Sequence, residues 1–447
     1  MYEDKGNTEK RQQAQGKTEQ IEKKLFEHLR GVLFVMDQLI DRRLVVTFFG
    51  LVMALIQHRH RNEGAWMSKL GSYLVPENAE AGRKRIQKLL YSRKWDSRLL
   101  SEEHWRRADQ RVEQGAASGE PVLAIWDESV VEKPESLKLE GLGPVRSSKA
   151  VRLKRIKPGY FNPPGGRPIF VPGFNWLQVL VCGLRGPVTL AHMRFWTTRG
   201  DLASSKREEE HQVLRETTDR WRAQVIHVWD RGFAGTPWLS MAFFHAVRFV
   251  LRWPKNYTLL DENGNLKKAW EISRGKRSWV KRRLWDARRH CEREVGVVAF
   301  PVFDPTFHEP LWLVVSRQGP GKTPWYLLTS EPAHTPDLAW RIILIYARRW
   351  QIEMALRYDK SELAFESLRV FSLEVRQRLF QIIALVHAFL ILFLAPDLEA
   401  LRSYLLNVWC HRTGKRSRVV QAPLYRLRFA LAFFWSRFPP PFLARLN

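Results

Sequence analysis

Cysteine is scarce in this chain, with only Cys182, Cys291 and Cys410 among 447 residues. The three are far apart, so they form neither the paired ligand spacing of a zinc site nor a disulfide framework. Small disulfide-stabilised secreted proteins and zinc-finger proteins are therefore excluded. Unpaired, widely spaced cysteines suit a reducing compartment, and we expect the protein in the cytoplasm.

Long apolar runs are also few. The polar N-terminus has no apolar signal core, so we interpret residues 1–20 as a disordered arm and expect no export. The run 44–56 is shorter than the roughly 20 residues that cross a bilayer, and the run 379–395 contains Gln381 and His387. Both runs predict buried core helices, and we expect no membrane partner.

Acidic residues are outnumbered by basic ones, 46 against 73, which gives a formal net charge of +27. Such a charge attracts polyanions, so double-stranded DNA or another nucleic acid is the expected partner. The chain is 45% hydrophobic and 12% aromatic, which is enough to bury at least one sizeable core. We therefore expect a folded, nucleic-acid-binding protein.

Residues 21–113 have the apolar spacing of several helices, and the stretch 114–121, "QGAASGEP", has loop composition that predicts a domain boundary. Within this helical unit a basic helix, "GRKRIQKLLYSRKWD", combines an apolar stripe with many cations. We interpret these cations as DNA phosphate contacts, a solvated basic face being the alternative. The candidate residues are Arg83, Lys84, Lys88, Arg93 and Lys94.

Two apolar strands that end in the same dipeptide, Trp-Asp, organise the segment 121–244. They are "VLAIWD", ending at Asp127, and "VIHVWD", ending at Asp230. Between them the sequence predicts two further strands, 176–184 and 188–196, and a charged helix, 206–224. This order is typical of a mixed α/β sheet in which Asp127 and Asp230 emerge side by side at neighbouring strand ends.

The texture changes after residue 244. Short apolar pieces separated by Gly, Pro and Asp predict a β-rich insertion over 245–333, which contains the densest basic and aromatic stretch of the chain, 267–290. Helical patterns return over 334–395, and a basic, aromatic region that we expect to be helical occupies 396–447.

A row of four polar side chains marks the segment "YARRWQIEMALRYDK". On one continuous helix, Tyr346, Arg349, Glu353 and Lys360 would fall within an arc of roughly 60°. A solvated helix face has the same spacing. The row also places a third acid, Glu353, beside a phenol and two cations.

Asp127, Asp230 and Glu353 are our candidate catalytic and metal-binding residues. Three carboxylates suit two Mg²⁺ ions, with Mn²⁺ as a substitute, because magnesium prefers oxygen ligands and retains water. Two such ions bridging a phosphate would activate the attacking oxygen and stabilise the leaving oxygen.

Each acid also has an ordinary interpretation. Asp127 could cap a turn, Asp230 could begin the turn at Gly232, and Glu353 could pair with Arg357 one helical turn later. The metal interpretation is favoured by the combination, because two independent strands end in Trp-Asp and the third acid lies within a spaced polar row.

The spacing Y-x2-R-x3-E-x6-K at Tyr346, Arg349, Glu353 and Lys360 resembles the signature of DDE transposases of the insertion-sequence-four family. The strand-ending Asp127, the "DRGF" context of Asp230 and the basic N-terminal helix extend the resemblance over most of the chain. It implies an RNase H-like catalytic core interrupted by a β-rich insertion, with an N-terminal helical DNA-binding unit and a C-terminal helical region.

The resemblance also implies an activity. Family members of this kind nick one strand with water, form a hairpin with the freed 3′-hydroxyl, reopen it, and join the 3′ ends to target DNA. The signature Tyr, Arg and Lys are then DNA-phosphate contacts, and Trp325 is the candidate for stacking where a base is flipped. A homodimer pairing two terminal inverted repeats, associated with the nucleoid, is the implied assembly.

Two other classes remain open from the sequence. A non-catalytic DNA-binding regulator derived from a transposase would carry the same charge, although an intact set of acids argues against it. A metal-dependent structure-specific nuclease would use the same acids for hydrolysis without strand transfer.

Overall fold

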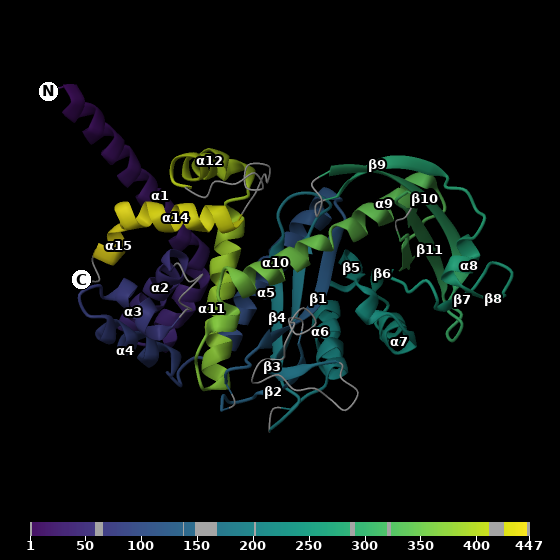
Figure 1. Cartoon of the computed structure of the whole chain (residues 1–447), viewed down its shortest axis with the longest axis horizontal. Helices are drawn as coiled ribbons and strands as arrows, with labels where there is room; N and C mark the ends of the chain where they lie inside the picture. The colour runs from purple at the N-terminus through teal and green to yellow at the C-terminus, as the bar shows by residue number, and fades with distance from the viewer. Residues whose placement is uncertain are drawn as a thin grey trace.

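The computed structural model describes residues 2–58, 66–136, 138–147, 168–200, 203–286, 291–319, 323–410 and 424–444. Within them the chain is a mixed α/β protein. A twelve-stranded sheet runs through the molecule, helices cover both of its faces, and a helical body holds both chain ends (Figure 1).

The N-terminal unit is helical, as the sequence predicts. Polar side chains cap three of its helices: Asp41, Asn78 and Asp96 each accept a hydrogen bond from a backbone N–H of the first turn that follows. The helices are α1 (Tyr2–Leu39), α2 (Arg42–Gln57), α3 (Met67–Leu74), α4 (Ala79–Leu90) and α5 (Ser97–Ser118).

The prediction of a disordered arm over 1–20 is wrong, because α1 begins at Tyr2. Tertiary contacts hold its second half in place. Ala14 is buried, and the Thr18 hydroxyl donates a hydrogen bond of 3.2 Å to the carbonyl of Phe438 near the other end of the chain. Composition alone could not indicate this partner, which is more than 400 residues away in sequence.

The predicted loop at 114–121 is also largely wrong. Helix α5 continues to Ser118, and only then does Gly119 adopt the left-handed conformation, with φ of +67°, that ends many helices. Gly115 lies inside the helix. A Cβ at this position would come within 2.2 Å of the Val122 side chain, so a larger residue would not fit. The glycine that suggests a loop therefore allows close packing of α5 on the sheet.

The first half of the sheet follows the predicted order of elements. Strands β3 and β4 pair antiparallel with β1 and β3 respectively, whereas β5 and β6 run parallel to β1 and β5. The elements are β1 (Val122–Glu132), β2 (Gly143–Arg146), β3 (Phe170–Cys182), β4 (Thr189–Trp196), α6 (Lys206–Trp221), η2 (Arg222–Gln224), β5 (Val225–Trp229), η3 (Arg231–Phe233), α7 (Thr236–Phe244) and β6 (Arg248–Arg252).

The strand-rich segment after residue 244 extends this same sheet. Its last strand, β12, pairs with β6, and the order continues through β11 and β10 to β7 and β8, while β9 pairs with β10. The remaining elements are β7 (Thr258–Leu260), β8 (Leu266–Lys268), α8 (Ala269–Ser273), β9 (Val280–Asp286), β10 (Cys291–Phe303), β11 (Pro310–Arg317) and β12 (Trp325–Thr329).

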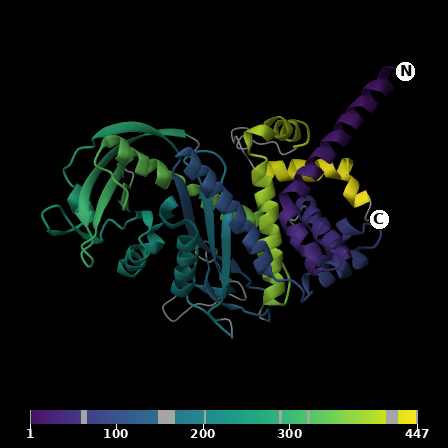
Figure 2. The same ribbon diagram turned by 180° about the vertical axis from the view of Figure 1, so that it is seen from behind.

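The two faces of the sheet have separate cores. One face packs under α9 (Pro336–Ala347), α10 (Trp350–Ser361) and α11 (Leu373–Leu392), and the other under α5, α6 and α7 (Figures 1 and 2). Because side chains alternate along a strand, Ile125 joins the first core and Trp126 the second. A residue's position in β1 therefore decides which helices it meets.

The C-terminal region packs on the N-terminal helices. Phe442 lies 4.5 Å from Phe49 between ring centroids, and its N–H donates to the Glu22 carboxylate over 2.7 Å. The described elements after α11 are η5 (Pro396–Leu398), α12 (Glu399–Val408), α14 (Leu424–Arg437) and α15 (Pro441–Ala444). Residues 411–423, the most basic part of this region, lie outside the described residues.

Helix α11 contains most of the second apolar run. It is long and apolar enough to cross a membrane, but 83% of its apolar window is buried inside the protein. The first run lies in α2, which is buried from Thr47 to Gln57. Both runs are core helices, as the sequence predicts.

Candidate active site

Asp127 lies inside a strand rather than at its end. Strand β1 continues to Glu132 because its pairing with β3 persists there, whereas its parallel pairing with β5 stops at Ile125. Asp127 therefore lies in the part of β1 that pairs with β3 but no longer with β5. The predicted strand end at Asp127 is therefore an end only of the pairing with β5, because β1 itself continues along β3.

Asp230 follows β5 directly and begins the short helix η3. The last parallel pair is Ile125 with Val228, so Asp127 and Asp230 each lie two residues beyond it. The preceding tryptophans, Trp126 and Trp229, pack edge to face at 6.2 Å on the opposite face of the sheet. Alternation then directs both acids toward α10, which explains the repeated Trp-Asp dipeptide.

The predicted single helix through residues 346–360 is interrupted. Helix α9 ends at Ala347 and α10 begins at Trp350, joined by a tight turn in which the N–H of Arg349 bonds to the carbonyl of Tyr346 over 3.0 Å. Tyr346 thus lies in the last turn of one helix and Glu353 in the first turn of the next. The four-residue row spans two helices, with Lys360 in the last turn of α10.

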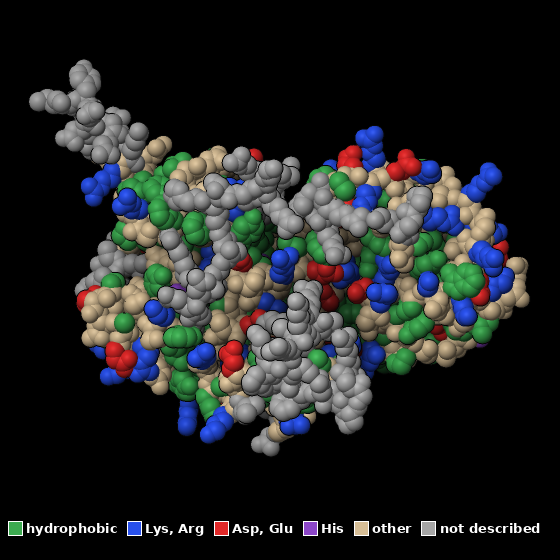
Figure 3. All heavy atoms as spheres, viewed as in Figure 1, with side chains coloured by type: hydrophobic (Ala, Val, Ile, Leu, Met, Phe, Trp, Pro, Cys, Tyr) green, Lys and Arg blue, Asp and Glu red, His purple; other side chains and the backbone are tan. Residues whose placement is uncertain are grey.

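All three acids meet the guanidinium of Arg349. One of its nitrogens, Nη1, lies 3.8 Å from Asp127 and 3.9 Å from Asp230, and the other, Nη2, donates to Glu353. Figure 3 shows acidic side chains gathered in a hollow near the centre of the face, beside basic ones. The structure therefore brings together the three candidate acids from β1, the end of β5 and α10.

Burial and mutual repulsion make this site electrostatically unusual. Burial raises the pKa of Asp127 to about 7, and the nearby Glu353 and Asp230 charges add to the rise, against the opposing effect of Arg349. Burial opposes the charge of Arg349, yet Tyr346 and the surrounding acids raise its pKa above the usual arginine value. Three carboxylates contact one guanidinium, so the acidic groups outnumber the cation and the site favours additional positive charge.

Tyr346 connects the acids to the strand-rich half of the sheet. Its hydroxyl donates to Asp230 over 3.1 Å, and burial raises its pKa above the usual tyrosine value. Its ring meets the Trp325 ring edge to face at 5.2 Å. Trp325 is thus in contact with the side chain that holds Asp230, which places this predicted residue at the site.

Arg252 is a site residue that the sequence reasoning missed. Its guanidinium carbon lies 5.7 Å from the Trp325 ring centroid and 5.8 Å from that of Tyr346. Burial lowers its pKa, which marks a cation held partly out of water. The only sequence signal was an arginine in "VLRW", at the end of an apolar strand.

A buried polar network fixes α10 against the sheet. Asp359 on α10 lies 2.7 Å from His387 on α11 and accepts a hydrogen bond of 3.2 Å from Gln178 on β3. Gln178 is the cross-strand partner of Asp127. Because an unpaired buried polar group costs free energy, this network favours one position of α10 relative to the sheet and hence one position of Glu353.

The oxygen-only donor set has the chemistry that Mg²⁺ prefers. In the described ranges, however, no three His, Cys, Asp or Glu side chains lie close enough as they stand to hold an ion. Arg349 lies among the three acids and supplies positive charge there. The donor types suit magnesium, but the acids as they stand do not form a metal site, and the expectation of two Mg²⁺ ions remains a prediction.

The basic residues of the N-terminal unit are not brought to the acids. Helix α4 lies in the helical body, away from the crossing of α10 over the sheet (Figure 1). Lys84, Lys88, Arg93 and Lys94 are exposed, whereas Arg83 is paired with Glu80 over 2.6 Å. They form a separate basic surface, and their DNA contacts remain a prediction.

No family model matches the chain, and no curated protein matches it. Among solved structures, the chain is similar to a piggyBac transposase in a synaptic complex with hairpin DNA, with 13% identity and a TM-score of 0.40. The match covers 90% of this chain and 74% of that one.

Proposed function

We propose that the protein is a DDE transposase that cleaves the ends of a mobile DNA element and joins them to target DNA. The single supporting observation is the meeting of Asp127, Asp230 and Glu353 at the Arg349 guanidinium. These acids come from three distant parts of the chain, and Glu353 and Arg349 also belong to the Y-x2-R-x3-E-x6-K spacing found in the sequence. The first sheet half, ordered β4-β3-β1-β5-β6, would serve as the RNase H-like core.

Within this proposal the three carboxylates would hold two Mg²⁺ ions, or Mn²⁺ in their place. The ions would supply activation of the attacking oxygen and stabilisation of the leaving oxygen during in-line phosphoryl transfer. The protein's part is to present oxygen ligands at fixed positions on a rigid sheet. Asp127 is held by the sheet itself, because the pairing of β1 with β3 continues on both sides of it.

Arg349 has two roles in this proposal. Without DNA it balances the charge of the acids that it contacts. When a phosphodiester enters, two of its oxygens would accept bidentate hydrogen bonds from the planar guanidinium. Movement of Arg349 toward the phosphate would then leave the carboxylates free to bind metal. Tyr346 and Lys360 would contact phosphates nearby, and Arg83, Lys84, Lys88, Arg93 and Lys94 would bind duplex DNA farther from the cut.

Assembly and location follow from the same proposal. Two protomers, each bound to one terminal inverted repeat, would pair as a homodimer in a synaptic complex. A protein of this charge working on chromosomal DNA would be associated with the nucleoid.

Loss of divalent metal tests the proposed reaction. A plasmid carrying the gene with its natural flanking DNA should lose the segment between the element's ends when the protein and Mg²⁺ or Mn²⁺ are present. Chelation with EDTA should stop the reaction, since carboxylates alone cannot activate the attacking oxygen. Gel analysis and sequencing of the ends give the readout.

The products also separate the other classes. Nicked or linear DNA that never joins a second plasmid would indicate a nuclease. Binding with no cleavage in either metal would indicate a non-catalytic regulator and contradict the proposal.

A hairpin intermediate gives Trp325 a specific role. A sharply bent DNA end is eased when one base leaves the stack and an aromatic ring takes its place. We expect Trp325→Ala to slow hairpin formation roughly tenfold, because base stacking contributes about 1–3 kcal/mol, while first-strand nicking changes less. Denaturing gels of labelled element ends resolve the two steps.

Trp285→Ala is the matched control, because Trp285 is exposed on β9 in the same part of the sheet. It should change neither step. Equal slowing of nicking and hairpin formation by Trp325→Ala would show that Trp325 only supports the fold around Tyr346.

A further inference from the structure

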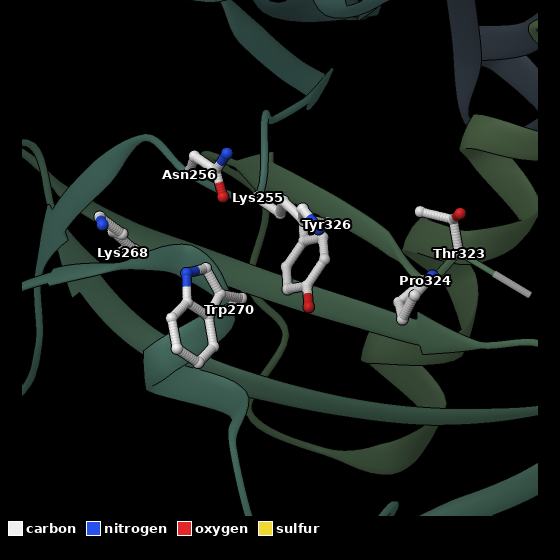
Figure 4. Close-up of a pocket in the computed structure, with 7 residues that line it drawn as sticks. All are labelled: Lys255, Asn256, Lys268, Trp270, Thr323, Pro324 and Tyr326. Atoms are coloured by element: carbon white, nitrogen blue, oxygen red, sulfur yellow. The ribbon is translucent and has the colours of Figure 1, made fainter.

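A cavity of about 710 Å³ opens in the strand-rich half of the sheet, apart from the acids. Its wall includes Trp270 from α8 and Tyr326 from β12, whose rings face the same hollow, with Lys255, Asn256, Lys268 and Pro324 around them (Figure 4). Tyr326 follows Trp325 directly. Because successive strand residues point to opposite faces, the cavity lies behind the strand that carries Trp325.

The protein's own bonds hold this wall in place. The N–H of Trp270 donates to the carbonyl of Lys255 over 3.1 Å, which ties α8 to the turn after β6. Arg274 lies 5.8 Å from the Trp270 ring centroid. Trp270 is half-buried and Tyr326 is buried, so both rings are fixed before a ligand arrives.

The cavity carries two exposed lysines. Lys255 and Lys268 are exposed, and neither makes an ion pair with another residue in the part of the chain that the structure describes. The neighbouring Lys267, in contrast, forms an ion pair with Asp261 over 2.6 Å. Two free ammonium groups beside two aromatic rings fit a ligand that carries both a phosphate and a flat ring.

Arg252 links this cavity to the acids. Its guanidinium donates to the carbonyl of Pro324 at the cavity wall over 3.1 Å, and the same group lies against Tyr346, which bonds to Asp230. Arg252 therefore contacts both the wall of the cavity and the residue that holds Asp230. A polyanionic strand leaving the acids would meet this positive charge on its way to the cavity.

We propose that the cavity binds an unpaired nucleotide of the DNA strand held at the acids. Trp270 and Tyr326 would contact the base, Lys255 and Lys268 the phosphates, and the Asn256 amide an edge of the base. Duplex DNA would not fit in the same way, because its bases are stacked inside. This proposal rests on the proposed function, because the transposase reaction would supply the DNA strand. Binding of a nucleotide in the cavity, however, requires no cleavage.

Binding of a short fluorescent oligothymidylate to the full chain, with EDTA present, tests the site without any cleavage step. We expect Trp270→Ala to weaken single-strand binding roughly tenfold, from the loss of one stacked base, with duplex binding nearly unchanged. Lys268→Gln, at an exposed position, should weaken single-strand binding severalfold and reduce its salt dependence. Fluorescence anisotropy over a range of salt concentrations measures both.

Trp285→Ala again serves as the control and should bind like the wild type. Oligothymidylate carrying 5-iodouracil should crosslink to peptides containing Trp270 or Tyr326 on irradiation. Unchanged single-strand binding in both Trp270→Ala and Lys268→Gln, or crosslinks confined to other segments, would overturn the site. If the protein cleaves element ends but fails this test, only the nucleotide site is refuted. If it passes this test but does not cleave, only the transposase function is refuted.

Discussion

Replacing any one of the three acids should abolish metal-dependent cleavage while leaving DNA binding nearly intact. We expect Asp127→Asn, Asp230→Asn and Glu353→Gln each to slow strand nicking by at least about a thousandfold, because groups that act as one unit fail together. DNA binding should persist because the phosphate contacts belong to other side chains. Single-turnover cleavage and mobility-shift assays on the same preparations measure the two effects.

The amide replacements keep the size of each side chain, so a loss of activity cannot be assigned to a cavity. Asp337→Asn is a matched control, because Asp337 is an acid at the start of α9 whose side chain is 80% exposed. It should cleave at the wild-type rate. Wild-type nicking by any one of the three site variants would remove that acid from the proposed site.

Arg349→Ala should have opposite effects on metal binding and on catalysis. Without DNA, the three carboxylates lose the cation that they share, so Mn²⁺ should bind more tightly than to the wild type. Cleavage should nevertheless slow by about 10 to 100 times, since a charge-assisted contact to phosphate contributes about 1.5–3 kcal/mol. Electron paramagnetic resonance of free Mn²⁺ measures the binding, and the nicking assay measures the rate.

Arg348→Ala provides the comparison for Arg349→Ala. The neighbouring Arg348 points elsewhere, donating to the carbonyl of Gly186 over 2.7 Å, so its loss should leave Mn²⁺ binding unchanged. If Arg349→Ala bound Mn²⁺ more weakly than the wild type, the guanidinium would be a support for the acids and not a substitute for metal.

Much of the site could be predicted from local sequence patterns. Two apolar strands ending in Trp-Asp and the spacing of the polar row were enough to select Asp127, Asp230 and Glu353. These patterns work because strand alternation and helix periodicity are local properties of the backbone. The order of strands and the charged helix α6 were predictable for the same reason.

Features that depend on pairing between distant segments were not predictable. The extension of β1 to Glu132 is caused by its pairing with β3, where Glu132 lies opposite Gly173, and helix α1 is held through Thr18 by Phe438. The buried Asp359 sits next to Lys360 in a polar stretch, and nothing local distinguishes it from a surface acid. The break between α9 and α10 contains no proline or glycine, so the sequence gives no signal that predicts it.

Anomalous scattering from Mn²⁺, in crystals of the full chain bound to a cleavable DNA end, tests the central claim most directly. The account predicts manganese within bonding distance of carboxylate oxygens of Asp127, Asp230 and Glu353, with Arg349 turned away toward a DNA phosphate. Manganese bound elsewhere, while the three acids stay on the Arg349 guanidinium beside the DNA, would contradict it.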